Sequence, residues 1–336
     1  SLKAVLEGLP DAIALLGPDE RVHMANPAFL NLVDMPEGDV LERPITEVLN
    51  LPEVSRVLES ARAERQLKAE VFYDDERQKH FRVMVCPIEM SSKESPMVLL
   101  LHDISETKRT EQIRRDFVAN VSHELKTPIA TIKGYAETLL EGALEEPETL
   151  REFLGTILSY SKRMENLVND LLQLTKIESG VIEMKKSTIS LKETLNEICK
   201  GFSARASEKG LSLLCEVVPQ DLTIEADPVR FSQIMHNLID NAVKFTDEGF
   251  VMVKAEHKDN HVTVEVTDTG PGIPRWALPR LGERFFRVDP SRSRALGGTG
   301  LGLAIVKHLV QAHNWRIEFD STPGKGTTAR IVIPQI

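Results

Sequence analysis

Two long amphipathic stretches in the middle of the chain constrain its fold more than any other feature. In residues 104–142 and again in residues 150–175, apolar side chains recur at steps of three and four, which places them on one face of an α-helix. The spacing is close to a heptad repeat. Because Gly142 and Pro147 indicate a turn between the two stretches, we expect an antiparallel helical hairpin.

A single hairpin of this kind leaves an apolar face without a partner. Two hairpins from two chains bury that face by closing a four-helix bundle. This apolar face, which we call the apolar seam, therefore predicts a homodimer. Its main apolar positions are Ile113, Phe117, Val121, Leu125, Ile129, Ile132, Ala136 and Leu139 in the first stretch, and Leu150, Leu154, Ile157, Met164, Val168 and Leu171 in the second.

The segment before the hairpin has a different texture. Residues 1–105 alternate short helical pieces, such as 27–30, with strand-like runs at 81–85 and 97–101. The polar run 91–96 between those two strands is expected to form a loop. This segment therefore predicts a small α+β domain.

Strands and helices also alternate after the hairpin. Asp227 followed by Pro228 is typical of a helix start, and this helix is expected to reach Lys244. A stretch rich in Gly, Pro and Arg, residues 271–300, is expected to be mobile. Further strands are expected at 251–256, 262–268, 316–319 and 328–333, and a further helix at 300–313.

A chain of 336 residues is too long for one ordinary core. We expect a multidomain protein: an α+β domain, a helical hairpin that forms a dimeric four-helix bundle, and an α/β sandwich. The predicted boundaries are 1–105, 106–183 and 187–336.

Composition excludes several classes of function. The formal net charge is −10, so broad nucleic-acid binding is not expected, and any bound phosphate must be neutralised locally. The three cysteines are scattered and form no CxxC pair: Cys86, Cys199 and Cys215. This pattern argues against a disulfide framework or a zinc site, and it is typical of a protein from a reducing compartment. No apolar run is long enough to span a membrane. Because the chain begins at Ser1, we expect a fragment whose membrane segment, if present, lies elsewhere.

The first candidate for chemistry lies inside the first long helix. Residues 122–128 read SHELKTP, so His123 and Thr127 share a helical face. A neutral imidazole is a good nucleophile toward phosphorus near pH 7, and the carboxylate of Glu124 is placed to hold the other ring N–H. Pro128 weakens the helix locally. The alternatives are a surface histidine beside a surface glutamate, or zinc, but Thr127 breaks the HExxH pattern.

The second candidate is a polar face on the helix that follows Asp227. Asn237, Asn241 and Lys244 lie at spacings of four and three and share that face. Amide oxygens can ligate Mg²⁺, and a lysine can meet a phosphate as a point charge. The alternative is ordinary solvation of an amphipathic helix.

Two glycine-containing segments complete the candidate site. Residues 268–273 read DTGPGI, so the carboxylate of Asp268 ends a strand and can accept from an exocyclic amine such as that of adenine; an ordinary turn is the alternative. Residues 297–303 read GGTGLGL and precede a helix, whose N-terminal N–H groups favour anions. Neither a Rossmann fingerprint, a P-loop nor the protein-kinase motifs are present.

Taken together, these segments resemble the histidine kinase family of two-component systems. Residues 122–128 look like its H box, 237–244 like the N box, 268–272 like the G1 box, 284–289 (RFFRVD) like the F box, and 298–302 like the G2 box. Five motifs in the family's order make a chance match improbable.

The resemblance implies specific roles. ATP with Mg²⁺ would bind to residues 187–336, in the sandwich fold shared with Hsp90, gyrase and MutL, beneath a lid at 284–298. Asn241 would ligate the metal. His123 would accept the phosphoryl group, with Glu124 as base. The remaining residues would be Asn237 and Lys244 at the phosphates, Asp268 at the adenine amine, Gly270, Gly272, Gly298, Gly300 and Gly302 in the binding loops, and Arg287 stabilising charge on the moving group.

The resemblance also implies partners. The phosphoryl group would pass to an aspartate of a response regulator, and Thr127 would position water for dephosphorylating that partner. The segment before residue 105 resembles a PAS domain, through residues 25–29 and 103–105, and could bind a small ligand. His23, His80 and His102 are better explained as solvated or structural histidines than as haem ligands. The domain order is similar to that of PhoR and WalK kinases, which implies the cytoplasmic portion of a membrane-anchored bacterial protein.

Two rival classes of function remain open at this point. A gyrase-like or Hsp90-like ATPase would share the nucleotide motifs but would have no use for a His–Glu pair on a dimerising helix. An inactive scaffold would bind and dimerise without turnover.

Overall fold

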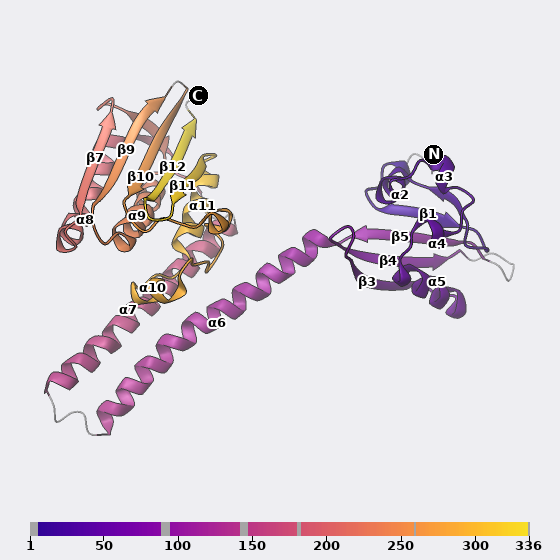
Figure 1. Ribbon diagram of the computed structural model, residues 1–336, viewed down its shortest axis with the longest axis horizontal. Coiled ribbons are helices and arrows are strands. Elements are labelled where there is room, and N and C mark those ends of the chain that lie inside the picture. The colour runs from indigo at the N-terminus through magenta and orange to yellow at the C-terminus, as the bar shows by residue number, and fades with distance from the viewer. Residues whose placement is uncertain (1–5, 89–94, 142–146, 180–182, 259, 335–336) are drawn as a thin grey trace. The chain divides into compact units, whose positions relative to one another are not determined.

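The computed structural model describes residues 6–88, 95–141, 147–179, 183–258 and 260–334. The chain divides into two compact units, Ser1–Asp116 and Phe117–Ile336, which we treat separately (Figure 1). The predicted turn between Gly142 and Pro147, and residues 91–94 of the predicted loop, lie outside the described residues. No helix in the described ranges is both long and apolar enough to cross a membrane.

The first unit is built on a five-stranded antiparallel sheet of order β2-β1-β5-β4-β3, with short helices packed against it. The predicted strands at 81–85 and 97–101 are confirmed as parts of β4 and β5. The strands are β1 (Ala12–Leu16), β2 (Val22–Ala25), β3 (Lys68–Asp74), β4 (Lys79–Pro87) and β5 (Met97–Asp103), and the helices are α2 (Pro27–Val33), α3 (Glu37–Val40), α4 (Ile45–Val48) and α5 (Pro52–Glu64).

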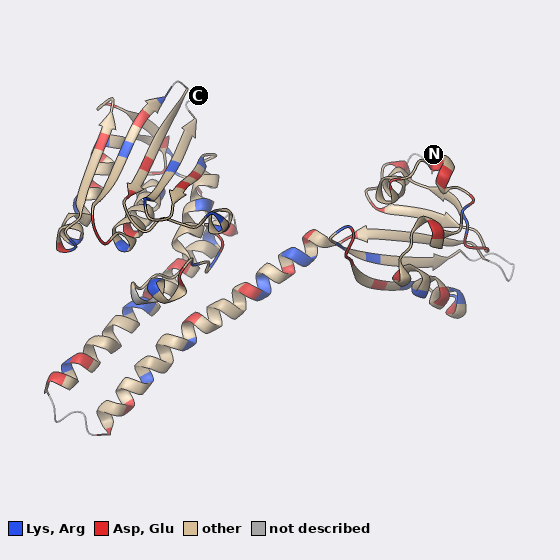
Figure 2. Cartoon of the chain, in the orientation of Figure 1, with Lys and Arg blue, Asp and Glu red and all other residues tan. Residues whose placement is uncertain are grey.

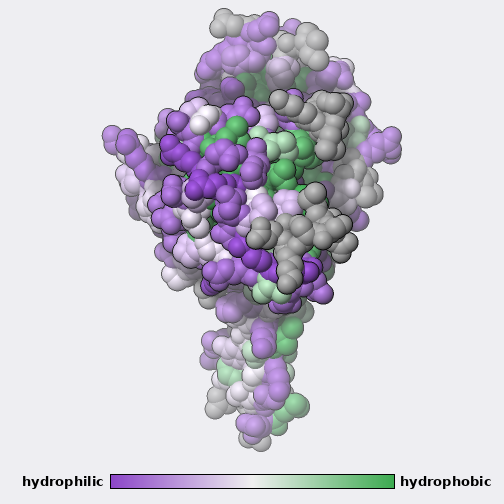
Figure 3. Space-filling model, turned by 90° about the vertical axis from the view of Figure 1, so that its right-hand side faces the viewer, coloured by the Kyte–Doolittle hydropathy of each residue, from purple (hydrophilic) through white to green (hydrophobic). Residues whose placement is uncertain are grey.

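Asn26 shows why this domain folds as it does locally. Its side-chain oxygen accepts from the N–H of Phe29, which caps α2, and from the N–H of Ile13 in β1. The cap therefore ties the helix to the sheet. Phe29 itself is fully buried in the domain core. The face of this domain that Figure 3 shows is mostly hydrophilic where it is coloured, with hydrophobic side chains in small groups.

The last strand of the sheet leads directly into the first long helix. The side chain of Asp103 accepts from the N–H of Ser105 at 3.0 Å and pairs with Lys79 at 2.8 Å. Burial alone would raise the pKa of Asp103, but the hydrogen bonds from Lys79 and Ser105 outweigh burial and lower it to about 2. The carboxylate is therefore ionised where α6 begins, as suits a helix N-terminus.

The two predicted long helices are confirmed as α6 (Ser105–Leu140) and α7 (Pro147–Glu178), and they run antiparallel (Figure 1). Tyr135 and Phe153 pack edge to face, with ring centroids 4.9 Å apart. Several apolar side chains of the two helices nevertheless stay exposed in the single chain, and four of them, Ile113, Ile129, Leu154 and Val168, belong to the predicted apolar seam. The exposed apolar residues of the two helices include Ile113, Val118, Ile129, Leu140, Leu154, Leu158, Val168 and Leu172.

The C-terminal part is a two-layer α/β sandwich. Its sheet has the order β11-β12-β10-β9-β7, in which only the β7–β9 pairing is parallel, and α8, α9 and α11 cover one face (Figure 1). The strands are β7 (Ser212–Val218), β9 (Phe250–Lys258), β10 (His261–Asp268), β11 (Arg316–Thr322) and β12 (Gly326–Pro334), the helices are α8 (Leu191–Glu208), α9 (Pro228–Phe245) and α11 (Gly302–Ala312), and β6 (Ser187–Ser190) pairs with β8 (Thr223–Ala226).

The helix start predicted at Asp227 is confirmed. Its carboxylate accepts from the N–H groups of Val229 and Arg230, and Pro228 is the first residue of α9. The predicted fold class is confirmed as well: an α+β domain, a helical hairpin and an α/β sandwich. The pairing of two hairpins and the three domain boundaries remain predictions.

The uncovered face of the sheet carries a row of alternating charges. Across the five strands, directly opposed positions run acidic, basic, acidic, basic, acidic, and Figure 2 shows these bands crossing the sheet. Opposite charges at facing positions stabilise a sheet, so the row helps to fix its register. The residues are Glu216, Lys254, Glu265, Arg330 and Glu318.

His313 is buried at the C-terminal end of α11, in the helical layer of the sandwich. Its imidazole is only 2% exposed and stacks on Trp315 at 4.1 Å. One ring nitrogen accepts from the N–H of Asp227, and the other donates to the carbonyl of Leu309. Because both ring nitrogens have fixed partners, this histidine serves packing rather than chemistry.

We expect the stability of this domain to fall as the pH drops below about 6.5. Burial lowers the pKa of His313 in the folded chain, whereas an exposed histidine titrates near 6.5. The unfolded chain therefore binds more protons below that pH, so the contribution of His313 is present above it and is lost on acidification. His313→Gln should cost about 1–3 kcal/mol at pH 7 and should reduce the loss between pH 7 and 5.5.

Chemical unfolding followed by tryptophan fluorescence measures this, since both tryptophans, Trp276 and Trp315, belong to this domain. Gln311→Ala, at an exposed residue of α11 near His313 that does not titrate, is the control and should keep the original pH dependence. An unchanged slope in the His313 variant would contradict the assignment.

Candidate active site

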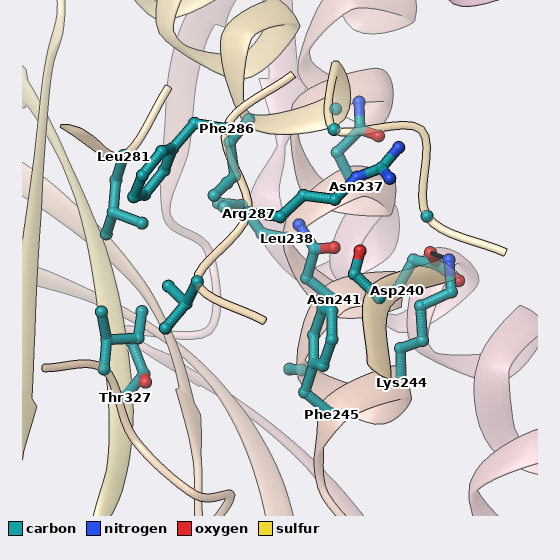
Figure 4. A pocket seen from close by; sticks show the side chains of 18 of the residues that line it. Asn237, Leu238, Asp240, Asn241, Lys244, Phe245, Leu281, Phe286, Arg287 and Thr327 are labelled. Carbon is teal, nitrogen blue, oxygen red and sulfur yellow. Dashed lines mark hydrogen bonds and ion pairs between the residues drawn. The ribbon is translucent and has the colours of Figure 1, made fainter. Parts of the chain in front are cut away.

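A cavity of about 610 Å³ opens in the second unit between α9, α7, the end of the sheet and the loops around α11 (Figure 4). Nine of the residues predicted from sequence line it: Asn237, Asn241, Lys244, Asp268, Gly272, Arg287, Gly298, Gly300 and Gly302. Gly270, His123, Glu124 and Thr127 do not line it. The structure thus brings most of the predicted nucleotide site together, although it assigns no role to any member.

The polar wall of the cavity comes from one face of α9. Asn237 and Asn241 are one turn apart, and Lys244 follows (Figure 4). The ammonium of Lys244 is held by the carboxylate of Asp240 at 2.9 Å, and Arg205 reaches the same carboxylate at 2.5 Å. Sequence reasoning missed Asp240, although it lies between the two asparagines.

The charge state of Asp240 follows from these contacts. Burial would raise the pKa of Asp240, but attraction to Lys244 and hydrogen bonds from Lys244 and Arg205 lower it. The carboxylate therefore stays ionised and fixes the position of the Lys244 ammonium at the cavity wall.

The opposite end of the cavity is apolar around one carboxylate. Burial raises the pKa of Asp268, more than the hydrogen bonds from the N–H groups of Gly270 and Thr327 lower it. One carboxylate oxygen accepts from Gly270 at 2.8 Å, so Gly270 shapes the turn without lining the cavity. An apolar slot with one acceptor suits a flat heterocycle with an amino group. Its apolar residues include Val266, Ile273, Leu281, Phe286 and Phe319.

Two glycines are required by close approaches around the cavity. At Gly272, φ is +69° and a Cβ atom would lie 2.2 Å from the carbonyl oxygen of Thr322. At Gly300, φ is +76° and a Cβ atom would lie 2.9 Å from the Cα of Phe285. Both conformations and both spaces exclude any larger residue. α11 begins at Gly302, which lines the cavity. The unpaired N–H groups of its first turn therefore lie beside the cavity.

The predicted phosphoacceptor lies outside the cavity. His123 is exposed on α6, and the hydroxyl of Thr127 donates to the backbone carbonyl of His123 at 3.2 Å. Pro128 lies inside the helix and supplies no N–H to the carbonyl of Glu124. The structure therefore presents the imidazole to solvent, one residue before a carboxylate that contacts Arg287 of the cavity wall.

Glu124 and Arg287, both predicted to take part in catalysis, are paired with each other. The guanidinium of Arg287 donates to the two carboxylate oxygens at 3.2 and 3.0 Å, and also to the carbonyl of Thr299 at 2.9 Å. Arg163 of α7 lies 3.3 Å from the same carboxylate. The Arg287 and Glu124 side chains are only 6% and 15% exposed. This two-point pairing fixes orientation as well as charge.

Further contacts join the hairpin to the loops around the cavity. Phe117 of α6 packs on Phe285 with centroids 5.9 Å apart. Glu178, near the end of α7, lies 2.6 Å from Arg284 and 3.3 Å from His308. The predicted lid, residues 284–298, is thus held against both helices.

The hairpin also supplies residues of the cavity itself, which the sequence analysis missed. Asn166, Asn169 and Asp170 of α7 line it, and Asp170 accepts a hydrogen bond from the Thr299 hydroxyl at 2.7 Å. The only signal in the sequence is three polar side chains within two turns of α7, away from its apolar seam. The seam predicts a dimer interface and assigns no function to the face opposite it.

A divalent cation at this site would take its ligands partly from the protein and partly from water and phosphate oxygens. Among the described residues, no group of three or more His, Cys, Asp or Glu side chains is placed to hold a metal. Mg²⁺ usually keeps several waters and binds through few protein oxygens together with phosphate oxygens. The amide oxygen of Asn241 on the cavity wall fits that kind of site.

Comparison with known proteins places three families along the chain in order. Residues 10–106 match the PAS domain, residues 113–180 match the His Kinase A (phospho-acceptor) domain, and residues 226–336 match the histidine kinase-, DNA gyrase B- and HSP90-like ATPase family.

Solved structures support the same fold. Histidine kinase ThkA in complex with response regulator protein TrrA is similar over 99% of this chain and 98% of that chain, with a TM-score of 0.55 and 23% identity. Full-length ShkA in complex with AMPPNP is similar over 65% of this chain and 45% of that chain, with a TM-score of 0.50 and 31% identity.

Two curated relatives are similar over 99% of this chain. The sensor histidine kinase WalK of Bacillus subtilis is 34% identical, and the chain covers 55% of its length. The chain thus spans about half of several such relatives. The sensor protein kinase WalK of Staphylococcus aureus is 32% identical, and the chain covers 80% of that sequence. The chain belongs to the bacterial sensor histidine kinase family.

Proposed function

We propose that the chain is an ATP-dependent protein-histidine kinase that phosphorylates its own His123 and then passes the phosphoryl group to an aspartate of a response regulator. The observation that carries this proposal is the cavity lined by Asn237, Asn241, Lys244 and Asp268, next to the buried Glu124–Arg287 contact from the helix of His123.

The two ends of the cavity would match the two ends of ATP, the adenine ring and the phosphates. The half-buried carboxylate of Asp268 would accept from the adenine amine, and the apolar slot around it would cover the ring. Lys244 and the first turn of α11 would meet the phosphates. Mg²⁺, when bound through Asn241 and phosphate oxygens, would neutralise charge that builds up during transfer.

The chemical step follows from the groups on α6. A ring nitrogen of His123 attacks the γ-phosphorus, a P–N bond forms, and the bond to the ADP oxygen breaks. Glu124 would hold the proton on the other ring nitrogen, which stabilises the positive imidazole. Glu124 can do this only after Arg287 leaves its carboxylate. Arg287 would then be available to the γ-phosphoryl oxygens.

The partners are proposed on the same basis. The exposed apolar residues of α6 and α7 would be covered by the same helices of a second copy. ThkA has been solved with a response regulator, and a receiver domain of that class is the proposed acceptor here. Thr127, whose hydroxyl donates to the backbone carbonyl of His123, would position water for the hydrolysis of the phosphorylated receiver domain. A small ligand in the PAS domain and membrane anchoring remain predictions.

Replacing His123 with Gln should abolish autophosphorylation while nucleotide binding stays unchanged, because His123 lies outside the cavity. Incubation with labelled ATP, followed by a test for acid-labile, alkali-stable label, measures the first effect, and titration with AMPPNP measures the second. If the variant still acquires the label, the phosphoacceptor is wrong. Steady ATP hydrolysis without phosphoprotein would instead favour a gyrase-like ATPase.

Replacing Asn241 with Ala should remove the dependence of nucleotide affinity on Mg²⁺. The unsubstituted chain should bind ATP about tenfold or more tightly with Mg²⁺ than with a chelator, equivalent to about 1.4 kcal/mol, and the variant should not. Calorimetric titration under both conditions measures this. Asn196→Ala, on the exposed face of α8, is the control. Unchanged Mg²⁺ dependence would remove Asn241 from the metal site.

Replacing Leu158 with Glu should convert the dimer to a monomer, because Leu158 is an exposed apolar residue of α7 and a buried charge at its interface would be unpaired. Sedimentation velocity at micromolar concentration gives the oligomeric state. Leu214→Glu, at an exposed leucine of β7 in the ATP-binding domain, should remain dimeric. A monomeric parent chain would contradict the proposed bundle.

A further inference from the structure

Asp170 places a negative charge where the proposed function needs a triphosphate. It comes from α7, the second hairpin helix, and lines the same cavity as Lys244 and the glycine-rich loop, residues 298–302. Its carboxylate accepts from the hydroxyl of Thr299 at 2.7 Å. The loop that precedes α11 is therefore tied to the hairpin by a side chain inside the cavity.

Both groups that stabilise this carboxylate are ones that phosphates attract. Burial raises the pKa of Asp170, and the hydrogen bond from Thr299 and attraction to Lys244 act in the opposite sense. Lys244 also contacts Asp240 at 2.9 Å, so one ammonium serves two carboxylates. A triphosphate would attract the Lys244 ammonium and the Thr299 hydroxyl, and it would repel Asp170 across a partly buried space.

We propose that Asp170 is a positioning residue that holds the glycine-rich loop against α7 when no phosphates are present and is displaced from Thr299 when they bind. This inference rests on the proposed nucleotide site. In that arrangement Asp170 lowers nucleotide affinity, and the hydrogen bond that it loses couples occupancy of the cavity to the attachment of the hairpin.

The adjacent contact strengthens this coupling. The carbonyl of Thr299 accepts from Arg287, whose guanidinium also holds Glu124. One residue of the loop thus contacts α7 through its hydroxyl and reaches α6 through Arg287. A shift of Thr299 toward phosphates therefore acts on both hairpin helices at once.

Asp170→Asn tests the proposal because an amide keeps an acceptor for the Thr299 hydroxyl and removes only the charge. In the full chain, the variant should bind AMPPNP about tenfold more tightly than the parent, as expected when one nearby negative charge is removed. Its affinity for adenosine, which carries no phosphate, should be unchanged. Calorimetric or fluorescence titration with the two ligands measures both, and the unfolding transition confirms that the variant is folded.

Two variants serve as controls. Glu165→Gln makes the same change of charge at an exposed position of α7 outside the cavity and should leave both affinities unchanged. Asp170→Glu keeps the charge and should bind AMPPNP no more tightly than the parent.

The outcomes separate the possible failures. Unchanged AMPPNP affinity in Asp170→Asn would overturn the proposal, and so would equal tightening for adenosine, which would mean a generally looser cavity. Weaker AMPPNP binding would show that Asp170 is instead a ligand of the nucleotide's cation. If the parent chain bound AMPPNP not at all, the nucleotide site itself would be wrong, and not only the role of Asp170.

Discussion

The Glu124 carboxylate and the Arg287 guanidinium meet in a largely buried two-point contact that joins α6 to the loop around the cavity. Removing one partner of a buried ion pair typically costs about 3–5 kcal/mol, and here Arg163 beside Glu124 and the Thr299 carbonyl beside Arg287 would offset part of that cost. If a phosphate of a bound nucleotide replaced the Glu124 carboxylate as the partner of Arg287, the guanidinium would remain paired. The described arrangement can therefore be stable without nucleotide and can still give way to another when phosphates bind.

The contact also occupies both groups that the proposed mechanism uses. The oxygens of Glu124 accept from Arg287, and Arg163 lies beside them, so they are not available to the imidazole of His123. Arg287 is likewise unavailable to a γ-phosphate. Each residue keeps the other in place, and His123 remains exposed to solvent.

Local sequence patterns predicted much of the fold. The apolar seam predicted α6 and α7, and the Asp227–Pro228 pair predicted the start of α9, because both signals act within a few residues. The motifs also named nine residues of the cavity wall. In each case a short stretch of sequence carries its own structural requirement, as Gly272 and Gly300 do through their positive φ.

What the sequence analysis missed depends on contacts between distant segments. Arg287 and Glu124 are 163 positions apart, and Thr299 and Asp170 are 129 apart, so no periodicity records that they meet. The apolar periodicity of α7 also predicts an interface only for the face opposite Asp170, so it assigns no role to Asp170. The pairing of Asp240 with Lys244 was accessible, since the two are four residues apart on one helix.

Pro128 gives α6 a mechanical property that follows from one missing hydrogen atom. Without an N–H at this position, the carbonyl of Glu124 lacks its usual partner in the next turn. The helix is therefore easier to bend just downstream of His123. Bending at this point would change the direction of the His123 imidazole while Tyr135 stays packed against Phe153 of α7.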